Sequence, residues 1–265
     1  MRKEKVKYKV IISGDILEFS TFIAPPRPKK LDIGFDIKKT AFKSRSVNRS
    51  FVSGSLIRFD SLWRSKARLK RLIRCNKDLT VFLTLTFADN RSDLSDCNLQ
   101  FNLFIKRVSR LYPNFKYIAV PEFQKRGAVH YHLLTNINIP NLSLDMTKNS
   151  KSSVFKWERD FADDIWTFGF VKVKSVYGRI DLYLTKYLTK DIDKRLYGRR
   201  KFFYSQNISR PKVLTNFDVY SILKFERDII KKYYKLIFNN HIVNQFFSFN
   251  YYQYEKIKLC YTLTG

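Results

Sequence analysis

One stretch of the chain constrains the fold more than any other. Two strand-like runs, 115–123 and 128–135, flank the turn residues Lys125, Arg126 and Gly127. Both runs are rich in aromatic and β-branched residues, and glycine readily adopts the backbone angles of a tight turn. The pattern predicts two antiparallel strands joined by a short turn, and therefore an antiparallel sheet.

The second of these runs carries two of the three histidines in the chain, His130 and His132. Side chains alternate between the faces of a strand, so both imidazoles are expected on one face. The tight turn brings Glu122 close to them. Two histidines and a carboxylate form a mixed nitrogen and oxygen site suited to Mg²⁺ or Mn²⁺, or to zinc. Two solvated or hydrogen-bonded histidines would show the same spacing.

A second constellation lies about fifty residues further on. Tyr183, Lys186, Tyr187 and Lys190 share one face of a helix predicted over 179–190. A phenol is a poor nucleophile because its pKa is about 10. A nearby lysine favours the phenolate and also balances phosphate charge. The alternative is an amphipathic helix with packed tyrosines and solvated lysines.

Together the two constellations resemble the HUH endonuclease superfamily of rolling-circle replication initiators. The strand His130-Tyr131-His132 is similar to the family's histidine–hydrophobic–histidine motif, and the strand 80–87 is similar to its first motif. The doubled Tyr183 and Tyr187 resemble the two-tyrosine initiators of single-stranded DNA phages and some plasmids. The run 198–211 also resembles a segment common in the phage and plasmid members. The resemblance covers roughly residues 60–212.

The resemblance implies a site-specific, metal-dependent DNA nickase. A phenolate from Tyr187 or Tyr183 attacks the scissile phosphate, leaving a 5′-phosphotyrosyl enzyme and a 3′-hydroxyl that primes a host polymerase. The second tyrosine then acts at the regenerated origin. Tyr187 is favoured as first nucleophile because lysines flank it on both sides. The implied roles are Mg²⁺ or Mn²⁺ binding by His130, His132 and, as the weakest assignment, Glu122, and phosphate positioning or phenolate stabilisation by Lys186 and Lys190.

The charge of the chain indicates the class of partner. Lysine and arginine number 51 against 23 aspartate and glutamate, a net charge of +28. Such a balance points first to nucleic acid, here single-stranded or hairpin origin DNA, and second to a membrane surface. The cations expected to contact the DNA backbone lie on a basic helix predicted over 60–74 and on a strand over 170–176: Arg64, Arg68, Arg71, Lys172 and Lys174.

Several features bear on where the protein works. The three cysteines are far apart and in no metal-ligand spacing, which fits a reducing, cytoplasmic setting, the host cytoplasm if the gene belongs to a phage. No signal peptide and no apolar run of membrane-spanning length is found. No phosphate-binding GxxxxGK[ST] loop is present, so we expect a host helicase to unwind the DNA.

The order of predicted elements defines the fold class. Within a core over 59–212 we expect strands at 80–87, 117–123, 128–136, 170–176 and 201–204, and helices at 94–112 and 155–168 before the tyrosine helix. This order predicts an α+β domain, an antiparallel sheet with helices packed on one face. The helix over 94–112 is expected to bury an apolar stripe made of Leu99, Leu103, Phe104, Val108 and Leu111.

The ends of the chain are expected to form extensions of this core. Residues 1–58 are basic, with a hairpin predicted from strands 6–12 and 16–23 and a linker over 25–30. Residues 213–265 are expected to hold a helix over 216–238 and then an aromatic-rich stretch over 246–261. His241, in this extension, is expected to be structural.

Three other interpretations of the sequence remain open. Another HUH enzyme, such as a conjugative relaxase or a single-strand transposase, would share the chemistry. A non-catalytic basic DNA-binding or packaging protein would need neither the histidine pair nor the tyrosine pair. An RNA-binding protein fits the charge, but the sequence shows no ribonucleoprotein aromatic motif.

Overall fold

The computed structural model describes most of the chain and divides it into two compact units. The described residues are 5–24, 59–139, 151–176, 180–188, 194–196, 199–215, 221, 230, 233–244 and 247–257. One unit consists of residues 11–17 and 59–213, and the other of residues 1–10, 18–58 and 214–265. The sequence suggested three segments, whereas the structure places the two ends of the chain in one unit.

The larger unit is built on a five-stranded antiparallel sheet with the order β6-β3-β5-β4-β7. The α+β class and the antiparallel sheet predicted from the sequence are confirmed. Central strand β5 is buried along its whole length, which requires cover on both faces of the sheet. The strands are β3 (Val81–Phe87), β4 (Tyr117–Phe123), β5 (Val129–Thr135), β6 (Gly169–Ser175) and β7 (Phe203–Tyr204).

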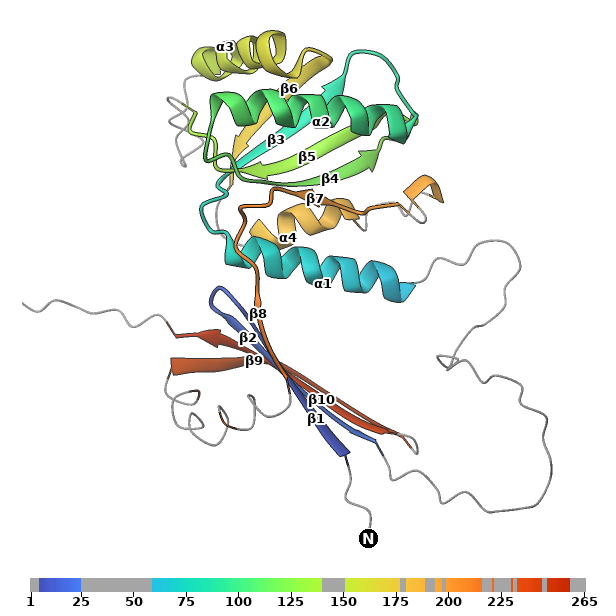
Figure 1. Ribbon diagram of the computed structural model, residues 1–265, viewed down its shortest axis with the longest axis vertical. Coiled ribbons are helices and arrows are strands. Elements are labelled where there is room, and N and C mark those ends of the chain that lie inside the picture. Colours follow the sequence, from blue (N-terminus) through green and yellow to red (C-terminus); the bar gives the residue numbers. More distant parts are fainter. Residues whose placement is uncertain are drawn as a thin grey trace, which may run out of the picture. The chain divides into compact units, whose positions relative to one another are not determined.

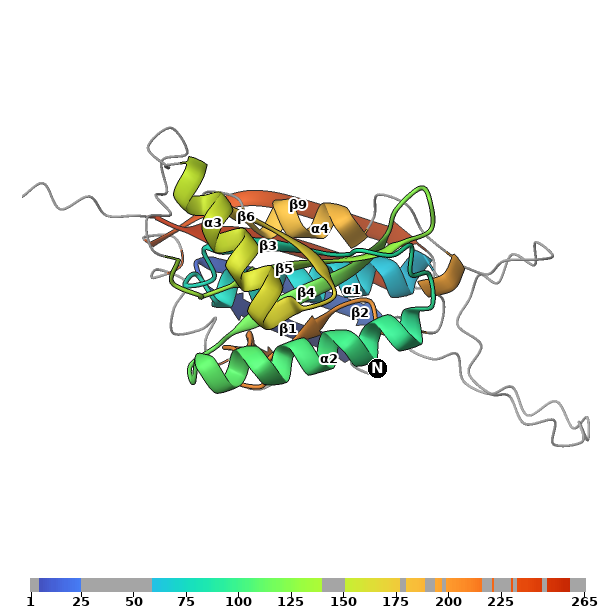
Figure 2. The ribbon, with the colours of Figure 1, turned by 90° about the horizontal axis from the view of Figure 1, so that it is seen from above.

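The first face of this sheet is covered by α2 (Leu94–Leu111), α3 (Lys151–Phe161) and a π-helical turn, Ala162–Trp166 (Figures 1 and 2). Trp166 is fully buried there, and its indole nitrogen donates to the Thr86 carbonyl at 3.0 Å. Aromatic rings from the strands and helices interlock around it. This face is therefore a rigid hydrophobic layer.

The apolar stripe predicted for α2 was partly wrong. Leu99, Leu103 and Leu111 are 63%, 44% and 61% exposed. The helix carries two apolar stripes at helical spacing, and the one with two phenylalanines packs on the sheet because aromatic side chains bury more apolar area. The buried residues of α2 are Leu94, Cys97, Phe101, Phe104 and Val108.

The second face of the sheet is covered by α1 (Phe59–Cys75), α4 (Ile180–Thr185) and a 3₁₀ turn, Lys186–Leu188 (Figure 1). The prediction that the helices pack on one face is therefore corrected, because a central strand buried on both faces needs a layer on each side. The apolar residues predicted for the basic helix, Leu62, Leu69, Leu72 and Ile73, are all buried.

The smaller unit centres on a second sheet with the order β8-β1-β2-β10-β9. The predicted hairpin is confirmed as β1 (Lys5–Ser13) and β2 (Ile16–Ala24), while the predicted basic linker lies outside the described residues. The helix predicted over 216–238 is wrong at its end, since β9 begins at Tyr234 and pairs with β10. The remaining strands are β8 (Lys212–Thr215), β9 (Tyr234–Asn244) and β10 (Phe247–Lys256).

That correction has a physical cause. The stretch Leu236-Ile237-Phe238 suits a helix or a strand by its local pattern alone. Its pairing with β10 satisfies the backbone hydrogen bonds over ten residue pairs, an interaction that short-range patterns do not reveal. Most of the predicted helix before Tyr234 lies outside the described residues. None of the described helices is long and apolar enough to cross a membrane.

The entry into β6 depends on one glycine. Gly169 has a φ of 152°, and a Cβ there would lie 2.4 Å from the Thr86 carbonyl oxygen and from the Ala88 nitrogen. Gly127, in the turn between β4 and β5, also has a positive φ of 93°, but a Cβ there would meet only the tip of the Arg195 side chain, at 3.4 Å. Backbone contact therefore makes position 169 the less tolerant of the two.

We expect Gly169→Ala to lower the free energy of unfolding by about 3 kcal/mol, and Gly127→Ala by about 1 kcal/mol. Both substitutions strain the backbone, but only the first also drives a methyl group into backbone atoms of β3. Urea unfolding followed by circular dichroism measures both values. Equal losses for the two variants would contradict the role of this contact.

Candidate active site

The register of β5 places both predicted metal-binding histidines on the second face of the sheet. His132 lies opposite Thr84 of β3, and His130 lies opposite Glu122 of β4. Because residues opposite each other on neighbouring strands share a face, these four side chains converge. The turn 125–127 that creates this register is closed by hydrogen bonds between Gln124 and residues 127 and 128.

His132 is buried and is hydrogen-bonded through both ring nitrogens. Its Nε2 lies 2.5 Å from Glu122 Oε2, and its Nδ1 lies 3.2 Å from Thr84 Oγ1. A carboxylate only accepts hydrogen bonds when it is ionised, so the Nε2 proton of His132 is donated to Glu122. Thr84 then donates its hydroxyl proton to Nδ1.

His130 is also buried, but only one of its nitrogens has a partner. Its Nδ1 lies 3.2 Å from Gln124 Nε2, while its Nε2 is buried with no hydrogen-bond partner among the described residues. Burial lowers the pKa of His130 to about 4, with His132 and Arg126 acting in the same direction and Glu122 opposing them. The ring is therefore neutral near pH 7, the form in which an imidazole binds a metal ion.

The two tyrosines come to this face from α4 and the 3₁₀ turn. The Tyr187 ring stacks on His132 with centroids 3.8 Å apart, and Tyr183 lies edge-on to it at 6.0 Å. Phe82 of β3 contacts Tyr183, Tyr187 and His132 from the sheet. The predicted tyrosine helix is thus α-helical to Thr185 and 3₁₀ from Lys186 to Leu188.

Of the two predicted lysines, Lys186 is described and Lys190 lies outside the described residues. The Lys186 ammonium stands 4.0 Å from the ring centroid of Tyr183 and 5.0 Å from that of Tyr187. Burial raises the pKa of Tyr187 well above its ordinary value, and the Tyr183 hydroxyl and the Glu122 carboxylate raise it further. The phenol is consequently protonated in the protein alone.

A buried ion pair fixes α4 to α1. Arg74 Nε lies 2.9 Å from Asp181 Oδ2, and the two side chains are only 14% and 7% exposed. Thr185 caps the same short helix by donating to the Asp181 carbonyl. A six-residue helix is not stable by itself, so these contacts and its buried leucine, Leu184, hold the tyrosines in place.

The run 198–211 that resembles a family segment lies along this layer where it is described. Its β7 pairs with β4, and its Phe202 and Ile208 are buried in the core between α1 and the sheet. Asn76, just after α1, donates to the Ser209 carbonyl and accepts from the Ser209 amide. The segment therefore closes the layer that carries the tyrosines.

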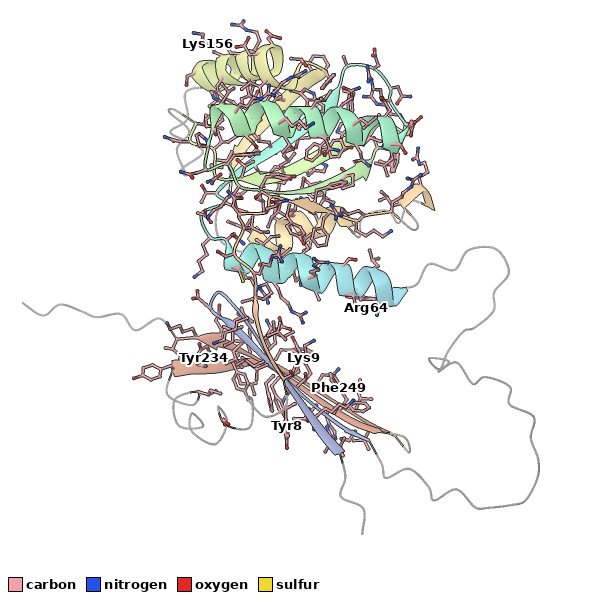
Figure 3. The ribbon with its side chains drawn as sticks, viewed as in Figure 1. Tyr8, Lys9, Arg64, Lys156, Tyr234 and Phe249 are labelled. Carbon is pink, nitrogen blue, oxygen red and sulfur yellow. The ribbon has the colours of Figure 1, made fainter. Side chains whose placement is uncertain are left out.

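The predicted DNA-contacting cations are distributed over α1 and β6. Arg64 is exposed near the start of α1 (Figure 3), while Arg71 is half-buried. Arg68 donates to the Tyr204 hydroxyl at 2.7 Å and packs over the Phe202 and Tyr204 rings. Because an arginine keeps donor groups free after one such bond, Arg68 can still meet a phosphate.

The two lysines on β6 share the face of the histidines, opposite Phe82 and Thr84. Lys172 forms an ion pair with Glu158 of α3 at 3.0 Å and covers the Phe155 ring. Lys174 is exposed. The strand thus offers one cation engaged by α3 and one exposed cation toward a bound strand.

The donor set of the site fits a divalent metal ion without forming a finished cage. Among the described residues, no group of three or more His, Cys, Asp or Glu side chains is arranged to hold a metal ion. The unsatisfied Nε2 of His130 nevertheless points to a missing ligand, since buried polar atoms are nearly always paired. His130, His132 and Glu122 supply the nitrogen and oxygen donors that Mg²⁺ or Mn²⁺ takes.

Comparison with known proteins agrees with this region of the chain. A family model for replication-associated proteins of the ORF2 type matches residues 80–192. The match begins at the strand that carries Thr84 and ends just beyond the two tyrosines, so it spans the strands and helices that build the site. It indicates a role in replication. A search of curated proteins and a search of solved structures each found no significant match.

Sequence reasoning did not find four residues that shape the site. Thr84, Phe82 and Gln124 contact the histidines, and Asp181 holds α4. For Thr84 and Phe82 a signal existed, because alternation along the strand 80–87 places them on one face with Thr86. The partnership of Asp181 with Arg74 joins positions 107 residues apart and has no local signal.

We expect Asp181→Ala to lower the free energy of unfolding by about 3 kcal/mol, because it leaves the Arg74 charge buried without this partner. Asp78→Ala is a matched control, since it removes an exposed ion pair with Lys116 and costs less than about 1 kcal/mol. The double variant Arg74→Met with Asp181→Leu recovers most of the loss. Denaturant titration of the four proteins decides; an Asp181→Ala loss no larger than the control's contradicts the assignment.

Proposed function

We propose that this protein is a site-specific, metal-dependent single-strand DNA endonuclease and strand transferase that nicks a replication origin and initiates rolling-circle replication of a phage or plasmid. The observation that carries the proposal is the stacking of Tyr187 on His132, with Lys186 beside both tyrosines. A nucleophile, a candidate metal ligand and a cation thus meet within one buried layer. The family match over residues 80–192 supports the replication role.

Tyr187 is the first nucleophile in this proposal because its ring contacts a candidate metal ligand, whereas Tyr183 is further away behind it. The phenol oxygen attacks the phosphorus and loses its proton to solvent. The bond from phosphorus to the 3′ oxygen breaks, and that oxygen takes up a proton to become a 3′-hydroxyl. The 5′-phosphate remains on tyrosine, so the phosphodiester energy is kept for rejoining, in which Tyr183 takes the second turn.

The protein groups around the phosphate have separate tasks. Lys186 balances charge on the phenol and phosphate oxygens, and Lys190 is proposed to do the same from the following turn. His130, His132 and Glu122 would hold Mg²⁺ or Mn²⁺, which when bound polarises the phosphate and offsets its developing charge. The phenol of Tyr187 is protonated by burial in the protein alone, so these cations are needed to favour the phenolate.

The remaining cations bind the strand outside the reacting centre. Arg64, Arg68 and Arg71 of α1 and Lys172 and Lys174 of β6 are proposed to contact backbone phosphates of single-stranded or hairpin origin DNA. Such contacts set affinity and its salt dependence rather than sequence choice. Unwinding and synthesis are assigned to a host helicase and a host polymerase, in the cytoplasm of the cell that carries the replicon.

The decisive experiment looks for the covalent intermediate. The protein is incubated with single-stranded circular DNA of its own replicon and Mn²⁺, and the products are separated in SDS. We expect a protein–DNA adduct that disappears with a chelator and falls at least about a hundredfold in Tyr187→Phe. The variant with His130→Ala and His132→Ala should form no adduct, and Tyr183→Phe should still form one in the first round.

Tyr112→Phe serves as the matched control, because Tyr112 packs against the opposite core and lies outside the site. It should give the wild-type amount of adduct. An adduct that survives loss of both Tyr183 and Tyr187 would overturn the nucleophile assignment. Salt-sensitive DNA binding with no cleavage, unchanged by these substitutions, would instead identify a basic DNA-binding protein.

A further inference from the structure

Gln124, at the end of β4, is hydrogen-bonded on both sides of its amide. Arg126 Nε donates to Gln124 Oε1 at 3.0 Å, and Gln124 Nε2 lies 3.2 Å from His130 Nδ1. The three side chains form a row from the exposed turn to the buried candidate ligand, because Arg126 is exposed, Gln124 is half-buried and His130 is buried.

The direction of these hydrogen bonds fixes where the proton of His130 sits. Arginine has only donor groups, so the oxygen of the Gln124 amide must face Arg126. The amide nitrogen, also a donor, then faces His130, and Nδ1 must accept with its lone pair. A neutral imidazole with a lone pair on Nδ1 carries its proton on Nε2. This is the nitrogen that is buried without a partner among the described residues.

Metal binding through Nε2 requires the opposite arrangement. The Nε2 atom must offer its lone pair, and the proton then sits on Nδ1, where a ligating histidine normally donates it to an acceptor. The nearest acceptor is Gln124 Oε1, which reaches Nδ1 when the amide turns over. The amide nitrogen would then face the Arg126 Nε–H, and two donors cannot form that bond.

We propose that Gln124 is a positioning residue that switches His130 between a proton-carrying and a metal-binding form, and that Arg126 locks it in the first. The lock and the metal-bound form exclude each other. Arg126 is therefore released when the site is loaded, on an exposed turn next to the reacting face, where its guanidinium can meet a phosphate of the bound strand. The proposal rests on the proposed function for the identity of the metal ion.

The neighbouring histidine shows why this lock concerns His130 alone. His132 also carries its proton on Nε2, donated to Glu122, and its Nδ1 faces Thr84 Oγ1. A hydroxyl rotates freely between donating and accepting, so Thr84 follows a proton shift without losing a partner. An amide held by arginine cannot do so. In both rings the shift moves one proton from Nε2 to solvent and one from solvent to Nδ1, with no net release.

The first test measures the ring protons directly, without turnover and without DNA. The chain has only three histidines, so ¹⁵N spectra of the labelled full chain are assigned with single variants. In the metal-free protein we expect the proton of His130 on Nε2, and saturating Mg²⁺ should move it to Nδ1. Arg126→Met should populate the Nδ1–H form before metal is added, while Lys125→Met, the same change one residue earlier, should not.

The second test measures Mn²⁺ affinity by calorimetry. Arg126→Met should tighten binding about tenfold, and Lys125→Met, which removes the same charge from the same turn, should change it less than about twofold. Gln124→Met, which takes the acceptor away from Nδ1, should weaken binding about tenfold or more. Circular dichroism checks that each variant is folded.

Equal effects of Arg126→Met and Lys125→Met would overturn the lock, because general charge repulsion would then explain both. A metal-free proton on Nδ1 would overturn the switch, even if the covalent DNA adduct still forms and the proposed function stands. Absence of Mn²⁺ binding by His130 would overturn the proposal as well. Loss of the adduct with the expected proton positions and affinities would instead reject the nickase while the switch stands.

Discussion

The register of β5 is the constraint on which the site depends. Side chains alternate strictly along a strand, so a slip of one residue against β3 and β4 would turn His130 and His132 into the opposite core. That core is filled by aromatic side chains such as Tyr131, whose ring stacks on Phe101 at 4.4 Å and whose hydroxyl donates to Asn98. The same packing that stabilises one face therefore fixes the two histidines on the other, beside Glu122 and Thr84.

Much of the larger unit could be predicted because its elements are strongly periodic. The strand bounds and the antiparallel class follow from alternation and from the turn at Gly127. Two features could not be read locally. Apolar residues on α2 form two stripes, and only the competition for space on the sheet buries Phe101 rather than Leu99. The pairing of β9 with β10 overrides a helix-compatible stretch, because strand pairing satisfies backbone groups that a short-range pattern leaves undecided.

For the site, alternation and turn geometry predict the shared face of the histidines and the nearness of Glu122. Spacing also predicts that Tyr183, Lys186 and Tyr187 lie together. What spacing does not contain is the distance between these two groups, which depends on a layer of helices packing on the second face of the sheet. Nor does it contain the hydrogen-bond directions at Gln124, since these follow from which side chains happen to be its neighbours.

Helix α1 links DNA binding to the chemistry in the proposed enzyme. Its inner residues pack on the sheet, and its Arg74 holds the short helix of Tyr183 through Asp181. Its outer positions carry Arg64 in solvent. Because a helix moves as one rigid element, a strand bound to the outer cations bears on the same helix that positions the tyrosines. Substitutions on the outer side should then alter affinity and salt dependence, whereas substitutions on the inner side should alter the rate of the covalent step with little change in affinity.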